Sequence, residues 1–333
     1  MKRIETRAYA RAGLVGNPSD GYFGKTLAVS IRDFCAKIVL YDWPTLEILP
    51  CEQDQVRFSS LDELALDVRL NGYYGGLRLV KASLKKFHEY CRAQEITLPE
   101  RNFSIRYESD IPRQVGLAGS SAIVTATFRA LMSFYEIAIP NEILPNWILA
   151  TERDELGIAA GLQDRVCQTY EGLVFMDFNR RLLETRGYGE YQRLDASLLP
   201  NLFLAYRTEL SQESGVTHSD LRARWEHGDE EVVSAMQDLA DLTEAARDCL
   251  LANRGEKLGA IMDANTDLRF RIMKVSDDNR AMIEAAHACG AAANFSGSGG
   301  AIIGQFADKK MLVRLKSELR MLGCRVLQPR LQP

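Results

Sequence analysis

A glycine-rich loop that runs directly into an apolar helix constrains the fold of this chain more than any other feature. Phe103, Ile105 and Tyr107 alternate with polar residues, and this alternation predicts a β-strand. The loop follows at residues 112–122, with the sequence Pro-Arg-Gln-Val-Gly-Leu-Ala-Gly-Ser-Ser-Ala. Apolar residues then recur at helical spacing as far as Tyr135. The segment therefore predicts a strand, a tight loop and a helix whose first turn carries hydroxyl groups.

This loop has the chemistry of a phosphate site. Glycines let a ligand approach the backbone closely, and a helix N-terminus presents free N–H groups and a positive dipole. Serine hydroxyls can also bind a hydrated magnesium ion. The predicted phosphate-binding residues are Pro112, Gly116, Leu117, Ala118, Gly119, Ser120, Ser121 and Ala122. The open alternative is a glycine turn with serine caps before a purely structural helix.

Gly24-Lys25-Thr26 imitates the end of a different phosphate loop, the Walker A motif. That motif needs a glycine five positions before its second glycine, and this chain has Ser19 there. The sequence therefore excludes a Walker A loop, and Lys25 is predicted to begin a strand.

Two acidic residues in the middle of the chain suit phosphoryl transfer. Glu152 and Asp164 lie on successive helical segments, with a break at Gly157. Phosphoryl transfer requires one carboxylate for magnesium and another for the substrate hydroxyl. Asp164 lies between Leu162 and Val166, in a mostly apolar or small stretch, which favours an acid facing a cavity. The alternative is that both acids face solvent on amphipathic helices.

Two turns have the composition of ligand-lining segments. A strand over residues 4–15 leads into a Gly-Asn-Pro-Ser-Asp turn, where Arg11 could face an anion and Asp20 could face sugar hydroxyls. The second turn, at residues 295–301, is rich in serine and glycine and separates two apolar strands. A solvated strand end with an Asx turn and a plain β-hairpin are the respective alternatives.

Composition limits the class of protein. The length of 333 residues suggests two domains, and 46% hydrophobic with 26% charged residues is typical of a globular protein. A net charge of -4 argues against nucleic acid as a partner. Seven cysteines without a Cys-x-x-Cys pair predict reduced thiols in the cytoplasm. The charged N-terminus and the lack of a long apolar run predict neither a signal peptide nor a membrane span.

The order of predicted elements divides the chain in two. The first part mixes helices with strands, including separate strands at residues 26–31 and 36–41. The second part contains long helical patterns from about residue 220 to 289, then a strand pair, a helix and a last strand. The boundary is predicted between Phe178 and Asn201, which gives domains 1–190 and 191–333.

The motifs, taken in order, resemble those of the GHMP kinases. Residues 11–20 are similar to the first motif of that family, residues 112–122 to its phosphate loop and residues 296–301 to its third motif. The resemblance is closer to one branch, the glucuronokinases. It rests there on residues 13–24, 73–76, 119–124 and 214–219. Tyr9-Ala10 and Asn17-Pro18 depart from the usual Pro-Gly and Glu-His of the first motif, which argues against galactose and mevalonate.

The resemblance implies an α+β fold with two domains and ATP bound between them. The N-terminal domain would be a mixed α/β nucleotide-binding domain, and the C-terminal domain would be ferredoxin-like. The implied activity is ATP- and Mg²⁺-dependent phosphorylation of the anomeric hydroxyl of a uronic acid, glucuronate, to the sugar 1-phosphate. The alternatives are another sugar, a sugar phosphate or a mevalonate-like acid as substrate, or a non-catalytic sensor of nucleotide or sugar. A sensor is expected to lack the catalytic acid.

The resemblance also assigns roles to residues. Asp164 matches the catalytic aspartate and Arg11 the basic residue beside the reacting groups. Glu152 matches the magnesium glutamate, with Ser120 or Ser121 completing the metal site. The substrate side would contain Asn17, Asp20, Tyr22, Gly297 and Ser298. For the carboxylate of a uronate, which needs a positive wall, the sequence offers Arg207, His218 and Arg222.

Overall fold

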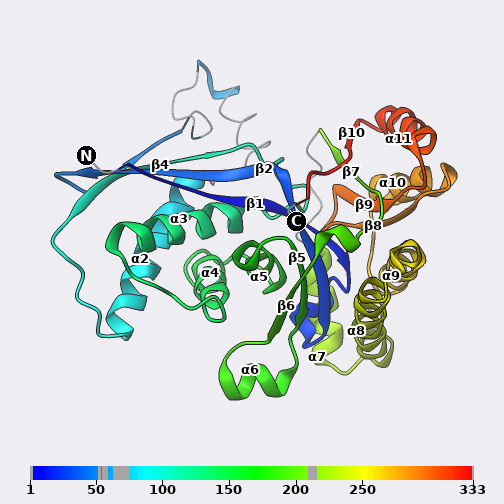
Figure 1. Ribbon diagram of the computed structural model, residues 1–333, viewed down its shortest axis with the longest axis horizontal. Coiled ribbons are helices and arrows are strands. Elements are labelled where there is room, and N and C mark those ends of the chain that lie inside the picture. Colours follow the sequence, from blue (N-terminus) through cyan, green and yellow to red (C-terminus); the bar gives the residue numbers. More distant parts are fainter. Residues whose placement is uncertain (1–2, 52–53, 55–58, 63–74, 209–215, 332–333) are drawn as a thin grey trace. The chain divides into compact units, whose positions relative to one another are not determined.

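The computed structural model describes residues 3–51, 54, 59–62, 75–208 and 216–331, without the side chains of 216–219. The chain forms two compact units, which Figure 1 draws together. Unit 1 comprises Met1–Ala10, Phe34–Ile111 and Gly119–Thr169, and unit 2 comprises Arg11–Asp33, Pro112–Ala118 and Tyr170–Pro333. Strands β1 (Arg3–Val15) and β2 (Lys25–Trp43) each run through both units and pair with each other.

Unit 1 packs helices against a sheet. The end of β2 pairs antiparallel with β4 (Asn102–Ser109), and β4 pairs parallel with β3 (Glu47–Leu49). The helices are α2 (Gly76–Ala93), α3 (Gly119–Tyr135), α4 (Leu144–Arg153) and α5 (Gln163–Tyr170). Phe128 of α3 contacts Phe87 of α2, and Phe134 of α3 contacts Phe103 of β4. Because α3 is buried along most of its length, its first turn is held in a fixed place.

Unit 2 contains the start of β2 and a separate four-stranded sheet. The start of β2 pairs with β5 (Leu173–Asp177), which pairs with β6 (Glu190–Leu194). The second sheet has the order β10-β7-β9-β8, from β7 (Leu202–Arg207), β8 (Ala292–Phe295), β9 (Ala301–Gln305) and β10 (Cys324–Leu327). The helices are α6 (Arg180–Arg186), α7 (Val216–Glu226), α8 (Glu230–Leu251), α9 (Leu258–Ile272), α10 (Asp277–Ala288) and α11 (Lys309–Met321).

The second sheet confirms the predicted ferredoxin-like part. All its neighbouring strands are antiparallel, and helices separate β7 from β8 and β9 from β10, as in the β-α-β-β-α-β arrangement. Helices α10 and α11 lie beside this sheet in Figure 1, and Ile283 and Leu315 pack into a core with Phe203 and Phe295. The predicted hairpin around residues 296–300 is the β8–β9 connection.

The structure departs from the predicted elements in two places. Residues 26–31 and 36–41 belong to one strand, β2, and not to two. The polar residues between them looked like a break, but Asp33 accepts a hydrogen bond from the backbone of Arg330, and Asp110 accepts one from that of Cys35. Helix α6 and strand β6 were not predicted. Helix α6 buries no residue, so it has no hydrophobic period to detect.

The predicted domain boundary near residue 190 stays a prediction. Within the described ranges, no helix combines the length and the apolar character needed to cross a membrane.

Candidate functional site

Ser120 and Glu152, two of the predicted site residues, meet in unit 1. Ser120 lies in the first turn of α3, and its hydroxyl donates a 2.7 Å hydrogen bond to Oε1 of Glu152. Glu152 lies in the last turn of α4 and is fully buried. Ser121, the alternative serine, is also fully buried. The contact therefore favours Ser120 as the serine that acts with Glu152.

Arg165 connects this pair to the second predicted acid. Its Nε donates a 2.8 Å hydrogen bond to Oε2 of Glu152, and its Nη2 contacts the same oxygen. Its Nη1 lies 3.4 Å from Oδ2 of Asp164. We call Ser120, Glu152, Asp164 and Arg165 the acidic centre. One guanidinium group thus joins two carboxylates that come from different helices.

The helices place the two acids in different surroundings. Glu152 ends an α4 helix whose Ile148 and Leu149 are buried, so its carboxylate points into the interior. Asp164 lies in the first turn of α5, where the helix dipole favours a negative charge, and its side chain is 21% exposed. Asp164 is therefore the more accessible of the two acids.

The acidic centre fits a magnesium ion of the kind that phosphates help to hold. Magnesium takes oxygen ligands and usually only one or two protein carboxylates. The hydroxyl of Ser120 and the carboxylate of Glu152 are such oxygens, 2.7 Å apart. In the described part of the chain, no group of three or more His, Cys, Asp or Glu residues could hold a metal by itself. A metal here would depend on phosphate and water for its other ligands.

The glycines of the phosphate loop and of the third motif fall into two classes. In unit 2, a Cβ on Gly116 would come within 3.1 Å of backbone atoms of Ser298 and Gly299, and one on Gly297 would collide with the carbonyl of Gly116. These glycines let two loops of unit 2 pack backbone against backbone. In unit 1, a Cβ on Gly119 would meet only Ile111, at an ordinary 3.5 Å. The fold therefore does not need a glycine at position 119, and a ligand that approaches the loop is a separate reason for one.

Arg11 is held at these loops of unit 2. Its side chain is buried, and its Nη1 donates hydrogen bonds to the carbonyls of Ser296 and, at 3.5 Å, Gly116. Its backbone N–H donates to the carbonyl of Leu117 at 3.2 Å. Arg11 therefore lies between the phosphate loop and the third motif, and its role beside the reacting groups stays a prediction.

A second buried arginine, Arg269 of α9, lies in the same unit and was not predicted. Its Nη2 donates a 2.9 Å hydrogen bond to the carbonyl of Gly297, and its Nη1 donates to Oδ1 of Asn17 at 3.3 Å. Its guanidinium carbon lies 4.9 Å from the ring centre of Phe295. Burial, and then repulsion by Arg11, lower the pKa of Arg269 to about 10. We call Arg11 and Arg269 the arginine pair.

The sequence carried a signal for Arg269. The buried positions of α9 follow a helical period, at Leu258, Met262, Asn265, Thr266, Arg269 and Ile272. An arginine on the buried face of a helix is rare unless it is paired or functional. The glycine-rich turns by themselves do not indicate Arg269.

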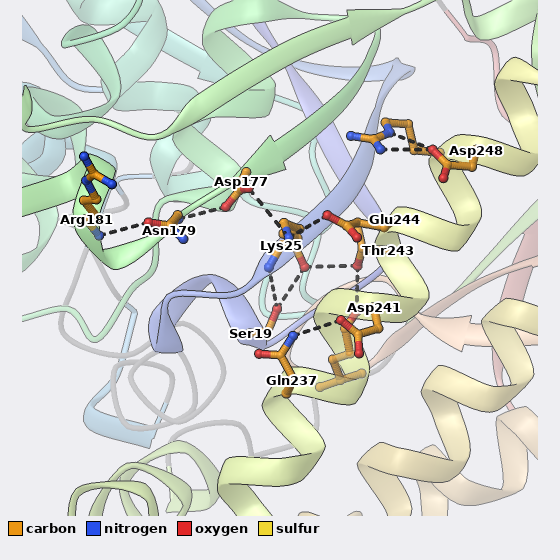
Figure 2. A network of polar contacts seen from close by, with 12 residues as sticks. Ser19, Lys25, Asp177, Asn179, Arg181, Gln237, Asp241, Thr243, Glu244 and Asp248 are labelled. Atoms are coloured by element: carbon orange, nitrogen blue, oxygen red, sulfur yellow. Dashed lines mark hydrogen bonds and ion pairs between the residues drawn. The ribbon is translucent and has the colours of Figure 1, made fainter.

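Helix α8 and strand β5 contact the segment that carries Ser19 and Lys25 (Figure 2). The backbone carbonyl of Lys25 accepts hydrogen bonds from the hydroxyls of Ser19, at 2.8 Å, and Thr243, at 3.1 Å. The side-chain Nζ of Lys25 forms ion pairs with Glu244, at 2.7 Å, and Asp177, at 3.7 Å. Lys25 thus begins β2, as predicted, and its charge anchors the turn.

Two other predicted substrate residues lie in the 3-10 helix η1 (Ser19–Tyr22) that follows. Asp20 is half-buried there. The ring of Tyr22 packs edge-on against Trp225 of α7 at 5.5 Å, and burial raises the pKa of the Tyr22 hydroxyl to about 12. Arg222 also lies over this ring, at 5.5 Å.

The predicted carboxylate wall stays a prediction, and the structure gives the contacts of its two arginines. Arg207 forms an ion pair with Asp278. Arg222 pairs with Glu226 at 2.8 Å and donates to the carbonyl of Gly21 at 2.6 Å. The side chain of His218 and residues 73–74 and 214–215, which carried part of the resemblance, lie outside the described residues. Ser298 is exposed beside the buried Gly297.

Comparison with known families and proteins finds similarity along most of the chain. The GHMP kinases N terminal domain matches residues 78–172, and the GHMP kinases C terminal family matches residues 246–321. Glucuronokinase 1 of Arabidopsis thaliana is 43% identical, over 98% of this chain and 91% of that protein. Probable glucuronokinase 2 of the same plant is 45% identical, over 90% of this chain and 83% of that protein.

A solved structure supports the fold. The galactokinase of Lactococcus lactis, in complex with galactose, has a TM-score of 0.78 to this chain at 14% identity. The match covers 99% of this chain and 94% of the galactokinase. The two-domain fold expected from the motifs is therefore confirmed.

Proposed function

Because the chain belongs to the GHMP kinase family, we propose that it transfers the γ-phosphoryl group of ATP to the anomeric hydroxyl of glucuronate. The product is the sugar 1-phosphate. The observation that carries this proposal is the 43% and 45% identity with two plant glucuronokinases over nearly the whole chain. The acidic centre supplies the chemistry that such a transfer needs.

In the proposed reaction, Asp164 accepts the proton of the anomeric hydroxyl. The hydroxyl oxygen forms a bond to the γ-phosphorus of ATP, and the bond from that phosphorus to ADP breaks. A general base must lie within reach of the proton, and Asp164 is the more exposed acid of the centre. The 3.4 Å contact with Arg165 holds the carboxylate in place.

The same centre would hold Mg²⁺ through Glu152 and Ser120, with Ser121 as the alternative serine. Bound magnesium neutralises charge on the phosphates of the nucleotide. Glu152 needs a fixed position for this, and its contacts with Ser120 and Arg165 provide one.

The phosphate loop would bind ATP through Pro112, Gly116, Leu117, Ala118, Gly119, Ser120, Ser121 and Ala122. The space at Gly119 and the N-terminus of α3 suit a phosphate. Arg11 would stabilise negative charge on the transferred group. On the substrate side we propose Asn17, Asp20, Tyr22, Gly297 and Ser298, with Arg207 and His218 as candidates for binding the carboxylate. A cytoplasmic location stays a prediction.

The test is a measurement of ADP release with a panel of acceptors. The panel contains D-glucuronate, D-galacturonate, D-glucose, D-galactose and mevalonate, each with ATP and Mg²⁺. We expect D-glucuronate to give the highest kcat/KM, and phosphorus NMR to show an anomeric phosphate on the product. The Asp164→Asn variant controls for contaminating kinases. Turnover of mevalonate or a neutral sugar without turnover of uronates would contradict the proposal.

A further inference from the structure

Arg269 is a buried cation that the protein itself does not neutralise. Its side chain is 2% exposed, and in the described ranges no carboxylate lies within ion-pair distance of it. Its two hydrogen bonds go to neutral oxygens, those of Asn17 and Gly297. Its Nε–H is buried and has no hydrogen-bond partner. The guanidinium group therefore keeps both a positive charge and an unused donor.

This arrangement is costly in the absence of a ligand. Burying a charge is unfavourable unless it is paired, and a buried donor without a partner adds to the cost. The buried Arg11 repels the same guanidinium group, which contributes to its lowered pKa. The other buried arginine of the described chain, Arg165, contacts two acids. Arg269 therefore differs from Arg165 in that no acidic side chain of the described residues pairs with it.

The contacts of Arg269 place it at the substrate side. Asn17 belongs to the first motif and Gly297 to the third, and both are proposed to bind substrate. Asn17 is half-buried, so the guanidinium group is bonded to a side chain that is partly exposed. The bond between them is long, at 3.3 Å, and an anion can replace it.

We propose that Arg269 recognises the carboxylate of the uronate substrate, at a subsite formed with Asn17 and the Gly297 turn. The proposal rests on the proposed function and replaces Arg207 as its carboxylate-binding arginine. A guanidinium group presents adjacent N–H donors that match the two oxygens of a carboxylate. Arg207 is less suited, because it already forms an ion pair with Asp278. The carboxylate neutralises a cation that otherwise remains buried without an acid, so a neutral sugar leaves that cost in place.

The test compares glucuronate with its neutral amide, glucuronamide, in wild type and in Arg269→Met. In wild type we expect kcat/KM to favour glucuronate by about 10² or more, because a neutral group leaves the buried cation unpaired. In Arg269→Met the preference should fall to within about tenfold, with KM for ATP changed by less than about threefold. Arg271→Met is the matched control on the same helix, since Arg271 is exposed, and it should keep the wild-type preference.

Three results would overturn the proposal. An unchanged preference in Arg269→Met removes Arg269 from carboxylate recognition. Equal losses with both acceptors and a raised KM for ATP assign Arg269 to the phosphates of the nucleotide. Loss of the preference in Arg207→Met, but not in Arg269→Met, returns the role to Arg207. If Arg269→Met does not fold, Arg269→Gln carries the same test, because it removes the charge and keeps N–H donors for the neighbouring carbonyls.

Direct binding separates this proposal from the proposed function. If wild type does not phosphorylate glucuronate, the proposed function fails. Calorimetric titration with glucuronate and glucuronamide then still tests the subsite. Binding of glucuronate that is stronger than that of the amide, and that Arg269→Met abolishes, supports it. Equal binding of the two ligands contradicts it.

Discussion

The acidic centre of unit 1 and the arginine pair of unit 2 both bury charge, but they balance it differently. In unit 1 the buried Glu152 is matched by Arg165, and both of its oxygens accept hydrogen bonds. In unit 2 the buried Arg269 has only neutral acceptors. A paired carboxylate and guanidinium hold each other in position. A buried cation without an acidic partner makes the binding of an anion more favourable. We therefore propose that the acidic centre carries out the chemical step and that Arg269 selects the substrate.

The largest effect is expected for Asp164→Asn, which removes the proposed general base of the acidic centre. The change keeps the shape of the side chain and removes the charge that accepts the proton. We expect kcat to fall by about 10²–10⁴, with nucleotide binding and the preference for glucuronate over glucuronamide retained. Steady-state kinetics and ATP titration measure this.

Asp154→Asn is the matched control for that variant, because Asp154 is an exposed acid that follows α4 and contacts Arg153. It should keep normal turnover. Near-normal kcat in Asp164→Asn would remove Asp164 from the reaction.

The next effect concerns Gly119, where the fold has room for a side chain. Gly119→Val should weaken ATP binding by on the order of 10²-fold, because the branched side chain occupies the approach of the triphosphate. Gly119→Ala should lose less, since its Cβ meets only Ile111 at 3.5 Å. Titration with ATP and the unfolding midpoints of both variants separate ligand exclusion from damage to the fold. Wild-type affinity in Gly119→Val would exclude this loop from the nucleotide site.

A smaller effect is expected for Glu152→Gln, which tests whether the carboxylate that pairs with Arg165 also binds magnesium. The amide still accepts a hydrogen bond, but it is a weaker magnesium ligand and leaves Arg165 less well paired. We expect the Mg²⁺ concentration for half-maximal activity to rise by about tenfold before activity is lost.

Glu155→Gln is the control, because Glu155 pairs with Lys85 and Lys86 away from Ser120. Its Mg²⁺ dependence should match wild type. An unchanged dependence in Glu152→Gln, with a raised one in Glu155→Gln, would move the metal site to Glu155.

Local sequence patterns predicted much of the fold because the elements concerned bury regular apolar faces. The strand–loop–helix segment ending in α3 and the β8–β9 hairpin are examples. The same patterns could not predict that β2 is continuous, because the contacts involved join residues far apart in the sequence. Asp33 accepts a hydrogen bond from the backbone of Arg330, and Asp110 accepts one from the backbone of Cys35. Helix α6 gave no signal because it buries nothing.

The site shows the same division between local and distant information. Glu152, Asp164 and Ser120 stand out because their residue types and neighbours suit the chemistry. The role of Arg165 depends on a contact between α4 and α5. Arg269 lies far along the chain from Asn17, so the subsite exists only after folding. Residue type and spacing identify groups that react, and they do not reveal which buried charges lack a partner.

The unfolding free energies of Arg165→Met and Arg269→Met, without ligand, test the central claim most directly. Removing Arg165 leaves Glu152 as an uncompensated buried charge, so we expect a loss of about 3–5 kcal/mol. Removing Arg269 takes away a buried charge that no acid balances, so we expect a change of less than about 1 kcal/mol, or a gain. Urea unfolding at constant pH and ionic strength gives both values. Equal and large losses would contradict the account, because they would make Arg269 a structural charge satisfied by the protein itself.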